Sequence, residues 1–257
     1  MSRRRFIQNA AGLLVPFAAG ALLPASAGLL LPRKSLAQGW PRPGPGQRSF
    51  GAVEDTEYAS RTEFGSQNSD TASSSLEATG TNRCGLVFVF WDNQPRTISS
   101  MTWGGVAMTD SGAGKINNGV GVNMQAFFIL DADMGTGSKT ITATLSGTTS
   151  ELHVIAHYYR FVHQTTPIDT PVTNTLTGTS ESQNFTGGVD DGVIGGLIAD
   201  AAETVTSGNT DAGGGVAGSD YGFRCGRYNA AGTEVPLTFS WTTSTGAAFI
   251  GFVVNVA

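Results

Sequence analysis

The stretch Leu86-Val87-Phe88-Val89-Phe90-Trp91 decides the fold class, because it is apolar at every position and rich in β-branched and aromatic residues. A strand with one face in water alternates apolar and polar residues, whereas a strand covered on both faces is apolar throughout. Residues 86–91 are therefore predicted to form a central strand of a sheet, packed on both sides.

Similar short runs recur along the chain between clusters of Gly, Asn, Asp and Ser, with hardly any helical periodicity. Residues 139–145 alternate, with Ile, Ala and Leu on one face and Thr on the other. Gly104-Gly105 predicts a tight turn between two strands. The predicted strands are 86–91, 98–103, 106–109, 124–130, 139–145, 152–161, 193–198, 221–228, 237–241 and 248–256.

About ten short strands with frequent turns indicate an all-β fold, an antiparallel β-sandwich of jelly-roll or immunoglobulin-like type. Residues 52–80 are polar and Ser/Thr-rich, which favours edge strands and loops. Residues 204–220 are almost wholly small and polar, which predicts a long mobile loop. We expect one domain over residues 52–257, preceded by a Pro/Gly-rich linker at residues 38–51.

The N-terminus reads MSRRRFIQ and continues into a run without charge from residue 10 to residue 31. This pattern resembles the twin-arginine (Tat) signal of bacterial export. The resemblance implies export by the Tat route to the periplasm, the cell surface or the extracellular space. We expect cleavage after Ala37, within Ser35-Leu36-Ala37, although Ala25-Ser26-Ala27 offers a second site. A retained membrane anchor is the alternative, because about 22 residues can span a bilayer.

Removal of residues 1–37 makes the chain markedly acidic. That segment holds five of the 15 basic residues and none of the 20 acidic ones, so the remainder has a formal net charge of −10. Such a surface repels phosphates and anionic lipids. We therefore expect no nucleic-acid partner, and membrane contact only through the export signal.

The chain has two cysteines, Cys84 and Cys225, each in an Arg-Cys-Gly context. In an oxidising compartment an even pair in separate strands could form a Cys84–Cys225 disulfide. Two buried free thiols are the equally weighted alternative. The pair alone offers too few ligands for a zinc site.

Several segments in order resemble a β-sandwich module found in many bacterial and phage-associated proteins. They are ISSMTWGGVAMT at 98–109, FFIL at 127–130, GSKTITATLSG at 137–147 and YYRFVHQTTPI at 158–168. The module typically has a YGG-V-A-T turn and a G-V-D-Q-T-x-P loop, and the likeness covers residues 70–257. Trp103 stands where the module has Tyr, and Phe161 and His163 replace its Gly and Asp. The resemblance implies a sandwich fold and supplies no catalytic residues.

Four residues are candidates for metal ligands. His153 and His157 lie four apart on a predicted strand and so project from one face, although that face also carries Ile155 and Tyr159, which favours two buried histidines. Asp131 and Asp133 open a segment that resembles the start of a calcium loop. The twelfth position of that loop would be Thr142 instead of Glu, so an Asp/Gly turn is favoured. A structural calcium is the alternative, and no other cofactor is expected.

Trp103, Tyr158, Tyr159 and Tyr228 are candidates for ligand binding. Exposed aromatic rings could stack on sugars, whereas rings that fill an inter-sheet core would be structural. No catalytic residues are predicted, because the chain has no Gly-x-Ser-x-Gly motif and no paired-carboxylate motif.

Three function classes follow. The first is an exported, non-catalytic surface or extracellular structural protein that self-associates through sheet edges or an N-terminal strand, as a homo-oligomer or filament. The second is a carbohydrate-binding or adhesive module with glycan partners. The third is a secreted hydrolase acting on polysaccharides, which a sandwich with catalytic groups on distant strands would allow. The first class is favoured, and the chain is expected not to be an enzyme.

Overall fold

The predicted central strand is β2 (Cys84–Trp91), in which every residue is buried. The computed structural model describes residues 57–257 except 93, 94, 120 and 219. The expected signal peptide at 1–37, the linker at 38–51 and residues 52–56 lie outside the described residues. In the part that is described, no helix has the length and apolar character needed to cross a membrane.

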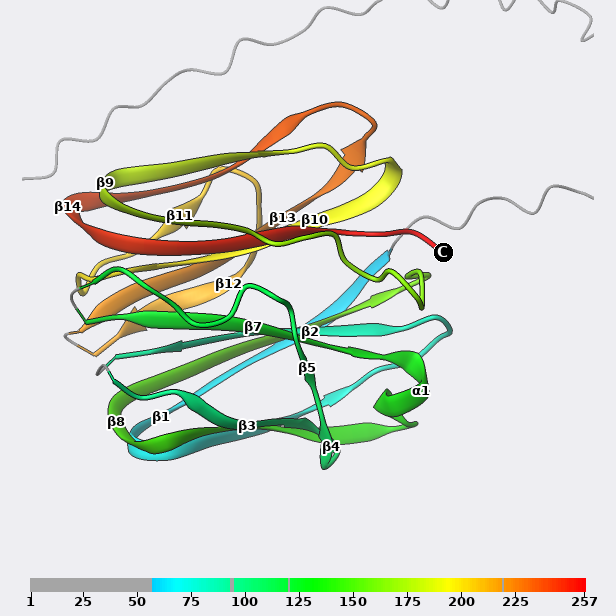
Figure 1. Cartoon of the computed structure of the whole chain (residues 1–257), viewed down its shortest axis with the longest axis horizontal. Helices are drawn as coiled ribbons and strands as arrows, with labels where there is room; N and C mark the ends of the chain where they lie inside the picture. The colour runs from blue at the N-terminus through cyan, green and yellow to red at the C-terminus, as the bar shows by residue number, and fades with distance from the viewer. Residues whose placement is uncertain (1–56, 93–94, 120, 219) are drawn as a thin grey trace, which may run out of the picture. The chain divides into compact units, whose positions relative to one another are not determined.

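The described strands form two antiparallel sheets, which confirms the all-β sandwich class (Figure 1). The first sheet has eight strands and the second has six. The first contains β1 (Glu57–Glu77), β2, β3 (Ile98–Trp103), β4 (Val106–Ala107), β5 (Thr109–Asp110), β6 (Ile116–Asn117), β7 (Asn123–Leu130) and β8 (Ser138–Arg160). The second contains β9 (Val172–Phe185), β10 (Val189–Ala199), β11 (Thr206–Ser207), β12 (Thr210–Ala217), β13 (Tyr221–Ala231) and β14 (Val235–Val254).

Several sequence predictions differ from the structure. The strand expected at 106–109 is two short strands, β4 and β5, and β6 was not predicted. The two strands expected at 139–145 and 152–161 are one strand, β8, and those at 237–241 and 248–256 are one strand, β14. The loop expected at 204–220 contains β11 and β12, and β9 was not predicted. Polar residues interrupt the apolar runs at these places. Most of these polar side chains face outward, although Thr149 and Glu151 of β8 are buried, and the backbone pairing continues through the polar stretches.

The two sheets repeat one topology. In the first, β1 and β8 form a long two-stranded ribbon, β2 and β3 pair with the C-terminal and N-terminal halves of β8, and β7 pairs with β2. In the second, β9 and β14 form the ribbon, β10 and β11 pair with the two halves of β14, and β13 pairs with β10. Residues 57–160 and 172–254 therefore form two structurally equivalent halves.

Each ribbon bends at its midpoint. The pairing register shifts between Ser69 and Thr71 in β1 and between Ser240 and Thr245 in β14. Such irregularities bend a strand and increase its twist. The outer part of each ribbon thereby folds over the rest of its own sheet, as a flap. The first flap comprises residues 71–77, β3 and residues 138–145, and the second comprises residues 180–185, β11 and residues 235–240.

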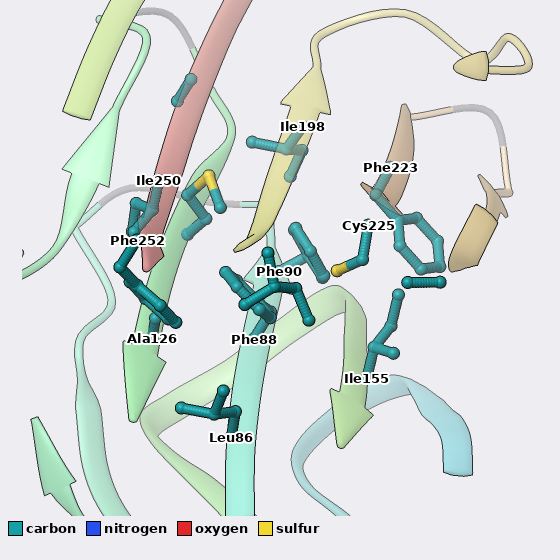
Figure 2. Packing of buried hydrophobic residues seen from close by; sticks show 14 of the residues in the cluster. Leu86, Phe88, Phe90, Ala126, Ile155, Ile198, Phe223, Cys225, Ile250 and Phe252 are labelled. Carbon is teal, nitrogen blue, oxygen red and sulfur yellow. The ribbon is translucent and has the colours of Figure 1, made fainter. Parts of the chain in front are cut away.

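Three hydrophobic cores result. One lies between the two sheets and contains Leu86, Phe88 and Phe90 of β2 packed against Ile250 and Phe252 of β14 (Figure 2). A second lies beneath the first flap, where Val87, Val89 and Trp91 of β2 meet the side chains of β3 and β8. The third lies beneath the second flap. The opposite faces of β2 thus enter two different cores, which explains its continuous apolar sequence.

Glycine at the centre of β10 lets the sheets approach closely. A Cβ atom added to Gly196 would lie 2.9 Å from Cδ1 of Phe88, in the inter-sheet core. A Cβ atom added to the adjacent Gly195 would lie 2.7 Å from Cδ2 of Leu237, in the core beneath the second flap. Real Cβ atoms essentially never come so near another carbon. A larger residue at position 195 or 196 would therefore push away the side chains that pack on the two faces of β10.

Candidate functional site

A polar pocket lies where the β1–β8 ribbon passes β12. It has a volume of about 380 Å³ and is lined by residues of β1, by Glu151 and His153 of β8, and by Val216 and Gly218. We call it the Glu151 pocket. Its volume is within the range of small-ligand sites in proteins.

Glu151 is an unusual residue for a β-sandwich interior, since its side chain is a carboxylate and the residue is only 6 % exposed. The side-chain amide of Gln67 donates a hydrogen bond to its Oε1 at 2.7 Å, and Nε2 of His153 lies 3.3 Å from its Oε2. The main-chain N–H of Glu151 donates to Oδ1 of Asp92 at 2.9 Å. Hydrogen bonds to both oxygens fix the orientation of the carboxylate.

His153 is held by aromatic rings on one side and borders the pocket on the other. Its ring centroid lies 4.7 Å from that of Phe223 and 6.0 Å from that of Tyr221. Across the strand pair it faces Gly65, where an added Cβ atom would lie 2.7 Å from Nδ1. Any larger residue at position 65 would therefore cover the Nδ1 edge of the imidazole.

Several carboxylates give the surroundings of the pocket a negative charge. Burial raises the pKa of Tyr221 well above its usual value, and the charges of Asp92, Glu151 and Asp220 raise it further. All three carboxylates therefore act on the phenol of Tyr221. A site with this potential favours cations and neutral hydrogen-bond donors over anions.

His153 and His157, predicted to share a face of one strand, do so in β8, but only His153 reaches a pocket. His157 is fully buried, and the hydroxyl of Tyr58 lies 3.3 Å from its Nδ1. Burial, assisted by Arg61 and Arg227, lowers the pKa of His157 to about 3, so the imidazole is neutral. Ile155 lies with His157 on the inter-sheet face, as expected for structural histidines.

The other metal candidates, Asp131 and Asp133, lie in the short helix α1 (Asp131–Met134). Asp131 forms an ion pair with the buried Arg83 at 2.5 Å, and its main-chain N–H donates to Gln164. Asp133 is exposed. In the described part of the chain, no three His, Cys, Asp or Glu side chains are grouped so that they could hold a metal ion.

The aromatic candidates lie in or against the cores. Trp103, Tyr158 and Tyr159 are 0 %, 5 % and 1 % exposed, so their ring faces are covered by protein. Tyr228 is half-buried, and its hydroxyl donates to the carbonyl of Val235 at 2.6 Å. These four rings therefore do not form an open platform for sugars, because stacking needs an accessible ring face.

Cys84 and Cys225 are both free and fully buried in the inter-sheet core. Of the two alternatives read from the sequence, the structure contains the pair of buried thiols. Burial raises the pKa of Cys84 to about 12 and that of Cys225 well above its usual value. Both thiols are therefore protonated and unreactive at neutral pH.

The outward faces of the two flaps carry rows of hydroxyl groups. In the first flap Thr142 of β8 lies between Thr102 of β3 and Ser73 of β1, and in the second Ser240 of β14 lies between Thr206 of β11 and Ser180 of β9. The equivalence of the two halves thus extends to these residue types. The flap strands point their apolar side chains into the core beneath the flap and most of their Ser and Thr side chains toward solvent. This alternation explains why these strands are rich in Ser and Thr.

Each ribbon also leaves one long edge. Among the described strands, β1 pairs only with β8 and β9 only with β14. Neither β1 nor β9 contains Pro or Lys, the residues that commonly block strand addition. The two edges differ in charge, since β1 carries exposed acids at Glu57, Glu63 and Glu77, whereas the single charged residue of β9, Glu181, is 5 % exposed.

Gln67, Gly65 and Glu151 were not predicted as site residues. The alternation of Glu151 and His153 places both on one face of a strand and could have been read from the sequence. The contribution of Gln67 could not, because it comes from a strand 84 residues away. Comparison of the chain with models of protein families, with curated proteins and with solved structures finds no match.

Proposed function

We propose that this chain is an exported, non-catalytic structural protein of the cell surface or extracellular space that self-associates through a sheet edge. The observation that carries the proposal is the open, uncharged outer edge of β9. An edge strand presents unpaired N–H and C=O groups, which a strand of a second copy can satisfy.

β9 suits pairing with itself better than β1 does. Its one acid, Glu181, accepts hydrogen bonds from Asn174 at 2.9 Å and Gln183 at 2.6 Å, so its charge is covered. Pairing of β1 with β1 would bring several exposed carboxylates of two copies together, which is unfavourable. An uncharged edge imposes no such cost.

The pattern of β9 also suits two-fold antiparallel pairing. Residues 172–178 pair with β14 without a shift in register, and Thr173, Thr175 and Thr177 are exposed. A two-fold axis at Thr175 would place Thr173 of one copy opposite Thr177 of the other. Threonine pairs across antiparallel strands are favourable, and a two-fold interface closes as a dimer.

The export expected from the sequence would suit the same function, because a twin-arginine signal would deliver an already folded sandwich outside the cytoplasm. The buried positions of Trp103, Tyr158 and Tyr159 give less support to the carbohydrate-binding alternative. The second sheet would become continuous across two copies, extended perpendicular to its strands.

Light scattering after size-exclusion chromatography of residues 38–257 tests the proposal. The unmodified protein should be dimeric or larger, and the double variant Thr175→Lys/Thr177→Lys should be monomeric. The control Thr140→Lys/Ser240→Lys places the same charges on exposed positions of central strands and should assemble normally.

A Thr175→Cys variant adds a geometric check. Cysteines at the two-fold axis would lie within disulfide distance, so mild oxidation should give a covalent dimer, whereas the native thiols are buried. A strictly monomeric unmodified protein would overturn the proposal. So would assembly that survives the lysine pair at positions 175 and 177.

A further inference from the structure

We propose that the Glu151 pocket binds a primary ammonium group, as carried by a lysine side chain or an amino sugar. The proposal does not rest on self-association, because the pocket lies on the first ribbon and β12, whereas the proposed interface lies on β9. It rests on two acceptor groups, a buried negative charge and the absence of side chains at Gly65 and Gly218, which leaves these groups accessible.

The first step concerns hydrogen-bond capacity. An ionised carboxylate offers about four lone-pair sites, and Gln67 and His153 occupy one on each oxygen of Glu151. Because the amide nitrogen of Gln67 faces the carboxylate, its carbonyl oxygen is left as an acceptor. Nε2 of His153 faces Oε2 of the carboxylate, so the imidazole orients Glu151 from one side of the pocket.

The second step concerns access. Gly65 lies beside Nδ1 of His153, where an added Cβ atom would come within 2.7 Å. Gly218 lies beside Oε1 of Glu151, where an added Cβ atom would come within 2.5 Å. The backbone of Gly65 does not have a positive φ, so its conformation does not require glycine. A side chain at position 65 would instead collide with the imidazole of His153 and with the carbonyl oxygen of Leu152, 2.8 Å from an added Cβ atom. Glycine at this position therefore keeps the edge of the imidazole uncovered.

The third step concerns the ligand. The carboxylate of Glu151 and the carbonyl of Gln67 are both acceptors, and an ammonium group has three N–H donors and no acceptor. Its positive charge complements a carboxylate that is 6 % exposed and flanked by Asp92. A sugar hydroxyl could donate only one hydrogen bond and would leave the charge without a partner.

The apolar rim of the pocket fits the stem of such a ligand. Val216 of β12 lines the pocket and is 42 % exposed, which is unusual for a large hydrophobic side chain. The methylene groups of a lysine side chain or the ring carbons of an amino sugar could lie against it. The net charge of −10 of the exported chain would further attract cationic ligands.

Titration followed by ¹H–¹⁵N spectra tests the proposal through the amide signals of Gly65 and Gly218. The probes are Nα-acetyl-lysine methylamide and its Nε-acetylated analogue, and glucosamine and glucose. We expect the two amines to shift both signals saturably and the two neutral analogues not to do so. The tighter of the two amines identifies the source of the ammonium group.

Two variants locate the binding. Glu151→Gln should weaken amine binding at least about tenfold, or ~1.4 kcal/mol, whereas the exposed control Glu77→Gln should leave it unchanged. Val216→Lys should place a tethered ammonium in the pocket and abolish binding of the added amine. Val106→Lys, at an equally exposed valine elsewhere, is its control. Since Val216 is exposed, this variant remains informative if Glu151→Gln does not fold.

Equal shifts from the neutral analogues would overturn the proposal, as would the absence of saturable shifts from both amines. Unchanged amine binding in Val216→Lys would also overturn it. None of these outcomes bears on the dimer, whose tests use variants on β9.

Discussion

The hydroxyl of Tyr58, on the edge strand β1, lies 3.3 Å from Nδ1 of His157, on the neighbouring strand β8. His157 is fully buried, and its Nε2 has no hydrogen-bond partner within the described structure. The Tyr58 contact is thus the hydrogen bond that the structure provides for this imidazole. It ties an edge strand to the core between the two sheets.

Replacing Tyr58 by Phe should therefore destabilise the protein. The ring would keep its packing beneath the guanidinium of Arg227, which lies 3.8 Å from the ring centroid, but His157 would lose its partner. Leaving a buried polar atom unsatisfied costs about 1–3 kcal/mol. Urea unfolding of Tyr58→Phe should show this loss, and a free energy of unfolding equal to that of the unmodified protein would contradict it.

The neutral state of His157 predicts a pH dependence of stability. Burial lowers its pKa to about 3 when folded, whereas in the unfolded chain the pKa is about 6.5. Between these values only the unfolded chain binds the proton, so stability is complete above about pH 6.5 and falls as the pH decreases. The slope from this group approaches ~1.4 kcal/mol per pH unit.

Comparison with His157→Gln isolates this contribution from that of the carboxylates. Urea unfolding at pH 7 and pH 5 should show a smaller loss of stability in the variant than in the unmodified protein. Identical losses in the two proteins would rule out His157 as the source.

Burial of the two thiols predicts that they react slowly with thiol reagents in the folded protein. In the native protein neither Cys84 nor Cys225 should react with a thiol reagent at pH 7, because burial keeps both protonated and covered. After denaturation without a reductant, two thiols per chain should react. Detection of no thiols in the denatured protein would contradict this prediction and would mean that the pair is oxidised.

Gly196 predicts the effect of filling the inter-sheet core. A methyl group at this position would lie 2.9 Å from Cδ1 of Phe88, so Gly196→Ala should force the sheets apart at a cost of about 1–3 kcal/mol. Gly178→Ala is the matched control, since its Cβ atom would meet only ordinary contacts at 3.9 Å. Thermal unfolding of both variants checks the difference, and equal midpoints would contradict it.

These cases show how much of the fold the sequence could predict. β2 was recognised because both of its faces are buried, so its residue type is constrained at every position. β9 was missed because its Thr residues face solvent and its pairing depends on β14, far along the chain. β12 was missed because Gly213 and Gly214 give it the composition of a loop, although their positive φ angles serve a bulged strand.

The site was predictable only in part for a related reason. Glu151 and His153 are two residues apart on one strand, so their common face follows from strand geometry. The Gln67 amide and the rim residue Val216 come from β1 and β12. Their meeting depends on the bend of the first ribbon and on the packing of the two sheets, neither of which a local sequence pattern encodes.

The repeated topology of the two halves has a consequence for the connection between them. Residues 161–171 join two units whose ribbons pair within each unit, and the ribbons meet through side chains in one shared core. The connection itself forms backbone bridges to the C-terminal end, at Val162–Val256 and Ile168–Val254. A break in this connection would leave every ribbon intact and would expose one large apolar face on each fragment. The two halves thus resemble the complementary subunits of a dimer that have been joined in one chain. Because they are covalently linked, their association is intramolecular and does not depend on protein concentration.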